Sequence, residues 1–280
     1  MTNHVPMPCI MEQGQLKLLN DEVISTLGTP LFFATPDLGR PYTQDARGKL
    51  YEIITGLYVI YHDHGVRFLS DFLEFTKVNL PAHGGNAVQA HVWSIETLRG
   101  GFVHGSLPDG KHAQNLMRKL NFFFPGTSQH WPGILPTMTD QDCMHMVTKL
   151  TSDSDRLVRY IQACSKRIAN DPNLLTSWQQ YILNDAMNDH TPKYGGKYFD
   201  GRIVEDIVHA CRDYTQPFLP YQSTIQQWLV KSNQKIRSGT LSDSDDLYKS
   251  LYNAVYDLYH PYVQYTKVSS ADSLLGDFDI

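Results

Sequence analysis

The sequence has few cysteines and no long apolar segment. Its four cysteines, Cys9, Cys143, Cys164 and Cys211, are far apart and form no Cys-x-x-Cys pair. They therefore predict reduced thiols, and neither a disulfide framework nor a zinc site. No apolar run is long enough to cross a bilayer, and residues 1–12 lack the basic and apolar segments of a signal peptide. We expect a cytoplasmic protein with no membrane partner, no metal and no cofactor.

The alternating pattern of β-strands joined by hairpin turns is also missing. Apolar residues instead recur at spacings of three and four, which is typical of amphipathic helices. The sequence thus predicts an all-α chain with four parts. These are a lead-in (1–45) with a short helix near 16–27, a helical bundle (46–125), a C-terminal helical region (139–265) and an acidic tail (268–280). A connection rich in proline and glycine, residues 125–136, separates the two helical regions.

Within the bundle region, residues 48–77 are predicted to form one long helix. A second helix is expected to begin near Asn86 and to end at Arg99, because two consecutive glycines follow. Its apolar face comprises Val88, His91, Val92, Ile95 and Leu98. Beyond residue 136, the pattern predicts separate helices at about 139–150, 152–169 and 173–188, with three more up to residue 260.

Arg99 and His104 lie where the helical pattern of the second helix gives way to glycines. Arginine stays charged and binds phosphate with a planar fork, whereas histidine exchanges a proton near neutral pH. One group of each kind is the minimum needed to break a phosphodiester without a metal. Arg99 is therefore a candidate phosphate clamp, and His104 a candidate proton-transfer group.

The helix, loop and second helix, followed by Leu98-Arg99 and His104-Gly105, resemble the HEPN superfamily over roughly residues 48–125. Members of this family are four-helix bundles. Many of them are metal-independent ribonucleases whose motif is arginine, four to six residues, and histidine. The resemblance implies an endoribonuclease of toxin-like or antiviral defence, with RNA as substrate and an antitoxin or regulatory protein as partner. It also implies a homodimer in which two motifs face each other, with Trp93, Phe102 and Val103 buried between the subunits.

Basic residues near the motif extend the candidate site. Between His83 and Lys119 there are four Lys or Arg, two acidic residues and four of the twelve histidines. Lys111, His112, Arg118 and Lys119 are the candidate RNA-binding residues of this segment. The net charge of −5 argues against a protein that coats nucleic acid without specificity, but not against an enzyme that grips a short RNA segment.

Two alternatives remain open at this point. Arg202 and His209 form a second Arg-to-His pair on one face of an expected helix, and could build a composite site with the first pair. The competing interpretation of the whole chain is a non-catalytic helical module for partner binding or dimerisation, in which Arg99 and His104 hold a structural contact. Gly100 favours that alternative, because the family usually has a polar residue there. His62 and His64 are expected on a helix surface or in contacts around the site, and not as metal ligands, because their spacing is wrong for one shared ion.

Overall fold

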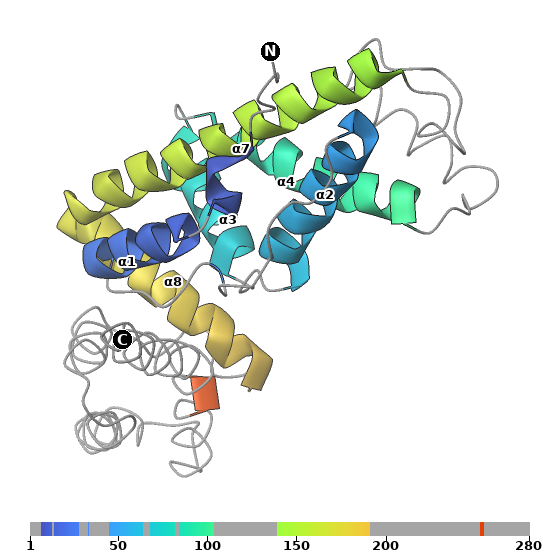
Figure 1. Ribbon diagram of the computed structural model, residues 1–280. Coiled ribbons are helices and arrows are strands. Elements are labelled where there is room, and N and C mark those ends of the chain that lie inside the picture. The colour runs from blue at the N-terminus through green and yellow to red at the C-terminus, as the bar shows by residue number, and fades with distance from the viewer. Residues whose placement is uncertain are drawn as a thin grey trace, which may run out of the picture. The chain divides into compact units, whose positions relative to one another are not determined.

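The computed structural model describes residues 7–12, 14–27, 33, 45–63, 68–81, 84–103, 139–190 and 253–254. This part of the chain contains six α-helices and no β-strand, so the all-α prediction is confirmed for it (Figure 1). The α-helices are α1 (Gln15–Leu27), α2 (Ala46–Tyr58), α3 (Phe68–Asn79), α4 (Gly85–Val103), α7 (Asp140–Ala169) and α8 (Pro172–His190). The described residues also include two short helical segments, the 3-10 turn η1 (Cys9–Met11) and the π-helical turn η2 (Val59–Asp63). None of the described helices combines the length and hydropathy that a membrane span requires.

The chain forms two compact units. The first comprises residues 1–22 and 32–164, and the second residues 23–31 and 165–280. The first unit contains α2, α3, α4 and most of α7, and it holds the candidate site. Most boundaries of the expected sequence ranges fall in 104–138 and 191–280, where only residues 253–254 are described. The four-part division of the chain therefore stays a prediction.

The prediction of one continuous helix over residues 48–77 is wrong. α2 ends at Tyr58, η2 follows it, and α3 begins at Phe68. The apolar spacing hides this break because α2 and α3 both bury their apolar faces in the core of the first unit. Gly56 lies on the buried side of α2 and allows Met11 of η1 to approach this helix closely. A Cβ atom at this position would collide with the side chain of Met11.

Two further helix boundaries differ from the prediction. α4 does not end at Arg99 but continues through Gly100 and Gly101 to Val103. A glycine costs a helix only about 1 kcal/mol relative to alanine, which neighbouring turns can offset. α7 is one helix of 30 residues, not two. The polar residues Thr151 and Ser154 interrupt its apolar spacing, yet both are buried and helical. The predicted helix near residues 16–27 is confirmed by α1.

α2 and α4 pack against each other in the core of the first unit, and α3 packs against α4. The predicted apolar face of α4 is confirmed, because all five of its residues are at most 8% exposed: Val88, His91, Val92, Ile95 and Leu98. α7 passes across these helices in the view of Figure 1, and the Tyr160 hydroxyl donates to Thr76 Oγ1 on α3 at 2.8 Å. This packing places the last turns of α4 beside the end of α2.

In the second unit, α8 buries Trp178 completely. The side chain of Gln179 donates from Nε2 to the carbonyl oxygen of Leu27 at 3.2 Å. Leu27 is the last residue of α1, so this bond satisfies one of the carbonyls that a helix end leaves unpaired.

Candidate functional site

Arg99 lies in the C-terminal part of α4 and is half-buried. Its guanidinium carbon Cζ lies 3.9 Å from the ring centroid of Tyr58, the last residue of α2. A cation held over an aromatic face is attracted by the ring quadrupole, and the N–H groups at the guanidinium edge stay available for other partners. Within the described ranges, no carboxylate pairs with Arg99. The contact therefore holds the charge in place without neutralising it.

His62 stacks on the same tyrosine. The rings of Tyr58 and His62 have their centroids 5.0 Å apart at an interplanar angle of 29°. Nε2 of His62 lies 3.3 Å from the carbonyl oxygen of Val92 on α4. A carbonyl oxygen only accepts, so Nε2 of His62 donates this hydrogen bond. We call Tyr58, His62 and Arg99 the surface cluster.

The surface cluster is fixed to α4 at both ends. Arg99 belongs to α4, and His62 binds the α4 backbone two turns earlier, at Val92. Tyr58 precedes His62 by one turn, so the two helical segments must run antiparallel for both contacts to form. The antiparallel register of α2 and α4 thus determines where the guanidinium of Arg99 lies.

Most of the predicted site residues fall outside the described residues. These are His104, Lys111, His112, Arg118, Lys119, Arg202 and His209. Their roles stay predictions. α4 ends at Val103, the residue immediately before His104. Trp93, expected at a subunit interface, is 56% exposed in the single chain.

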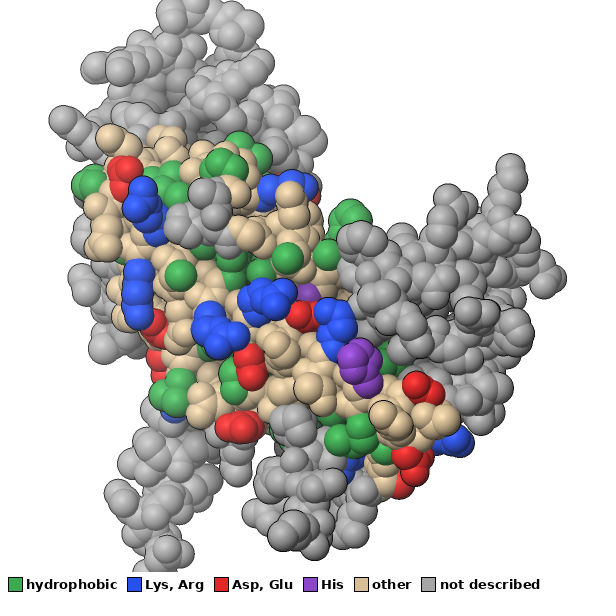
Figure 2. Space-filling model, turned by 90° about the horizontal axis from the view of Figure 1, so that it is seen from above, with side chains coloured by type: hydrophobic (Ala, Val, Ile, Leu, Met, Phe, Trp, Pro, Cys, Tyr) green, Lys and Arg blue, Asp and Glu red, His purple; other side chains and the backbone are tan. Residues whose placement is uncertain are grey.

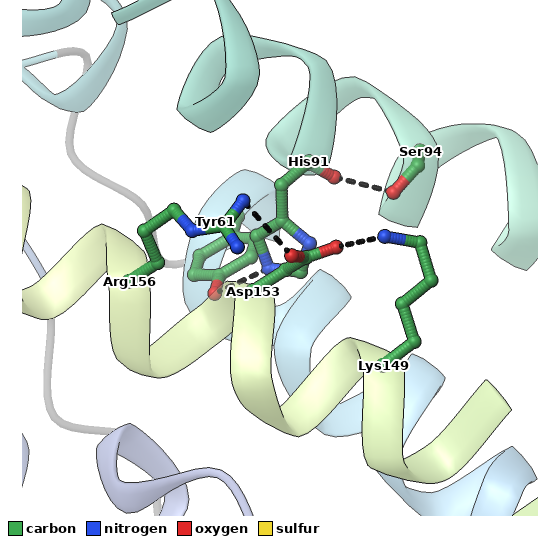
Figure 3. Close-up of polar contacts among 6 residues, drawn as sticks. All are labelled: Tyr61, His91, Ser94, Lys149, Asp153 and Arg156. Atoms are coloured by element: carbon green, nitrogen blue, oxygen red, sulfur yellow. Dashed lines mark hydrogen bonds and ion pairs between the residues drawn. The ribbon is translucent and has the colours of Figure 1, made fainter. Parts of the chain in front are cut away.

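A second polar group of the first unit is buried. The Tyr61 hydroxyl lies 3.2 Å from Nε2 of His91 (Figure 3). It also lies 3.0 Å from Oγ of Ser154. His91 is only 4% exposed, and its Nδ1 has no hydrogen-bond partner among the residues that the structure describes. Burial lowers the pKa of His91 to about 4, although the nearby Asp153 carboxylate opposes this shift. Burial also raises the pKa of Tyr61.

Tyr61, His91 and Ser154 are called the buried cluster from here on. They come from η2, α4 and α7, so their hydrogen bonds join three elements of the core. His91 is neutral near neutral pH because its lowered pKa lies well below that range. A neutral, enclosed histidine of this kind holds the core together and does not meet a substrate.

Sequence reasoning missed two features of the first unit. One is Tyr58, whose contact with Arg99 depends on helix register. The other is the exposed face of α7, which carries Lys149, Arg156 and Arg159 with His145 at helical spacing. Figure 2 shows several Lys and Arg side chains on this side of the molecule, with Asp and Glu side chains among them and a histidine beside them. The spacing of four, seven and three residues along one helix was the available signal in the sequence.

In the described part of the chain, no group of three or more His, Cys, Asp or Glu side chains is arranged to hold a metal ion. Comparisons with protein families, curated proteins and solved structures found no match to this chain. The function proposed below is based on the surface cluster and on the sequence motif that Arg99 shares with His104.

Proposed function

We propose that the protein is a metal-independent endoribonuclease of the HEPN type. Arg99 binds the scissile phosphate, and His104 transfers a proton. The ribose 2′-hydroxyl gives up its proton and its oxygen bonds to phosphorus. The bond from phosphorus to the 5′-oxygen breaks, and that oxygen takes up a proton. The products are a 2′,3′-cyclic phosphate and a 5′-hydroxyl.

The observation that carries this proposal is the guanidinium of Arg99, held 3.9 Å from the centre of the Tyr58 ring with no carboxylate partner in the described part. A charge fixed before the substrate arrives stabilises the developing negative charge without further reorganisation. An arginine paired with an acid would first have to break that pair. Arg99 lies four residues before Val103, the last described residue of α4, and His104 comes next in the sequence.

The same proposal includes a cytoplasmic homodimer with a toxin-like or antiviral role and an antitoxin or regulatory partner. The exposure of Trp93 on α4 supports the dimer, because large aromatic side chains concentrate binding energy at interfaces. In a two-fold contact the same patch of each subunit meets its copy. Both copies of α4 would then lie at the interface, with their motifs close together.

Incubation of total RNA with the full chain, in the presence of a chelator, tests the activity. We expect wild-type protein to cleave RNA and to leave 2′,3′-cyclic phosphate ends, and the His104→Ala variant to be inactive but folded. Expression of the wild type, but not of the variant, is expected to stop growth. Normal cleavage by the variant, or none by the wild type, would refute the proposal.

A non-catalytic helical module is the second candidate function. The contact between Arg99 and Tyr58 also favours it, because a cation–π pair joining two helices stabilises a fold without any substrate. Under this alternative, Arg99→Ala lowers the free energy of unfolding, and wild-type protein leaves RNA intact. The RNA incubation therefore separates the two candidates directly.

A further inference from the structure

The exposed face of α7 carries a line of basic side chains. His145, Lys149, Ser152, Arg156 and Arg159 follow one another at spacings of four, three, four and three residues. With 3.6 residues per turn, these five positions lie within an arc of about 80° and extend over about 21 Å. The side chain of Arg156 is 55% exposed and that of Lys149 36%.

The apolar side of α7 points the other way. Its residues Cys143, Met146, Val147, Leu150, Leu157 and Ile161 are all buried in the first unit. Among the described residues of α7, the basic face therefore includes no large exposed apolar side chain that could enter a lipid layer, as an interfacial helix requires. What it offers is a line of positive charge on a rigid helix.

Acidic groups lie at the margin of this face. Asp153 is 16% exposed and pairs with Lys149 Nζ at 2.8 Å and with Arg156 Nη1 at 3.4 Å (Figure 3). Two cations share this one carboxylate, so the group keeps a net positive charge and both side chains are held in position. For Arg159, no ion pair occurs with another described residue.

We propose that this face of α7 binds the phosphate backbone of single-stranded RNA. Arginine and lysine side chains in a line match successive phosphates, and release of condensed counterions drives such binding. The choice of RNA as the partner rests on the proposed function. The face positions the strand by its backbone and reads no sequence, because its contacts are with phosphate.

Fluorescence anisotropy with a labelled, fully 2′-O-methylated single-stranded RNA tests this proposal. The methyl groups block cleavage, so binding is measured alone. We expect the variant Lys149→Gln/Arg156→Gln/Arg159→Gln to bind at least about tenfold more weakly than wild type. The slope of log affinity against log salt should flatten by about 2, since each phosphate contact contributes about 0.7 for single strands.

Arg159→Gln alone is the second variant, because it leaves the pairs of Asp153 intact, and its slope should flatten by about 0.7. Lys77→Gln is the control: it removes the same charge from an exposed position on another helix, α3. If the folded triple variant binds RNA as tightly as wild type, the proposal is overturned. It is also overturned if Lys77→Gln loses as much RNA affinity as the α7 variants. The proposal is overturned, too, if the protein binds vesicles that contain phosphatidylserine and does not bind RNA.

A cleavage assay on unmodified RNA keeps the two proposals apart. If wild-type protein cleaves RNA and the α7 variants cleave with unchanged KM, the α7 surface is refuted while the ribonuclease stands. If the α7 variants lose binding and no protein cleaves, the ribonuclease is refuted while the surface stands.

Discussion

Two tyrosines only three residues apart, Tyr58 and Tyr61, each meet a histidine, and the two pairs have opposite properties. Tyr58 stacks on His62 at a half-buried position and also carries the guanidinium of Arg99. Tyr61 hydrogen-bonds to His91 inside the core. The same residue types thus form an accessible group in one place and an enclosed one in the other.

The difference comes from the turn that joins the two tyrosines. α2 ends at Tyr58, and the π-helical turn η2 carries Tyr61 into the core next to α4 and α7. Burial penalises the charged form of His91, so that histidine is unavailable for proton transfer near neutral pH. Residue type alone therefore does not identify a functional histidine. The surroundings of each ring decide what it can do.

The largest expected effect concerns the buried cluster and pH. The pKa of His91 is about 4 in the folded chain, against 6.5 for the unperturbed group. Between these values the unfolded chain binds more protons, so stability is complete above about pH 6.5 and falls as the pH drops towards 4. The loss amounts to about 3 kcal/mol. Chemical denaturation across this range measures it.

His91→Gln is the control for that measurement, since glutamine keeps a polar group but does not titrate. We expect the variant to be less stable at pH 7, with a shallower loss of stability between pH 6.5 and 4. An equally steep loss in this variant would assign the pH dependence to groups other than His91.

The next effect tests the surface cluster. Arg99→Lys should lower kcat for RNA cleavage by at least about 100-fold, because an ammonium group cannot reproduce the bidentate grip on phosphate. The free energy of unfolding should change little, since lysine also makes a cation–π contact with Tyr58. Steady-state cleavage and denaturation curves measure both quantities. Near-normal turnover by Arg99→Lys would show that Arg99 does not stabilise the transition state.

One substitution made at both tyrosines compares the clusters directly. Tyr61→Phe deletes a buried hydroxyl and leaves Ser154 Oγ and His91 Nε2 without their shared partner, at a cost of about 2 kcal/mol of stability. Tyr58→Phe keeps the ring that Arg99 covers, so its cost should be within about 0.5 kcal/mol. Thermal or urea denaturation of the two variants decides the matter. Equal losses would contradict the distinction between the clusters.

Much of the fold could be predicted from apolar spacing. The helix near residues 16–27 and the buried face of α4, including His91, follow from three-and-four periodicity. The π-helical turn after Tyr58 could not be predicted in this way, because the apolar pattern continues across it on both sides. The extension of α4 through Gly100 also escaped prediction, since the cost of a glycine is small enough for a helix to absorb.

Less of the candidate site could be predicted. Sequence reasoning selected Arg99 for its charge and its distance from His104, and the structure shows that Arg99 is positioned by Tyr58. That contact joins residues far apart in the chain, and it depends on the antiparallel register of α2 and α4. Helical periodicity predicts which faces of α2 and α4 are buried, but not how far one helix is shifted along the other. The contact between Arg99 and Tyr58 therefore cannot be predicted from the pattern within either helix.

The smallest expected effect concerns Tyr58 as a positioning residue. Tyr58→Leu keeps an apolar side chain but removes the ring under Arg99, which should lower kcat for RNA cleavage by about tenfold, the equivalent of a cation–π contact of 1–2 kcal/mol. Tyr58→Phe should retain the wild-type rate, because the guanidinium of Arg99 contacts the face of the ring and not the hydroxyl. Tyr51→Leu is the matched control: Tyr51 lies two turns earlier on α2, is 43% exposed, and should leave cleavage unchanged. If Tyr58→Leu and Tyr51→Leu have the same rate, the ring does not position Arg99. If Tyr58→Phe fails to retain the rate, the hydroxyl has a role that the stacking contact does not explain.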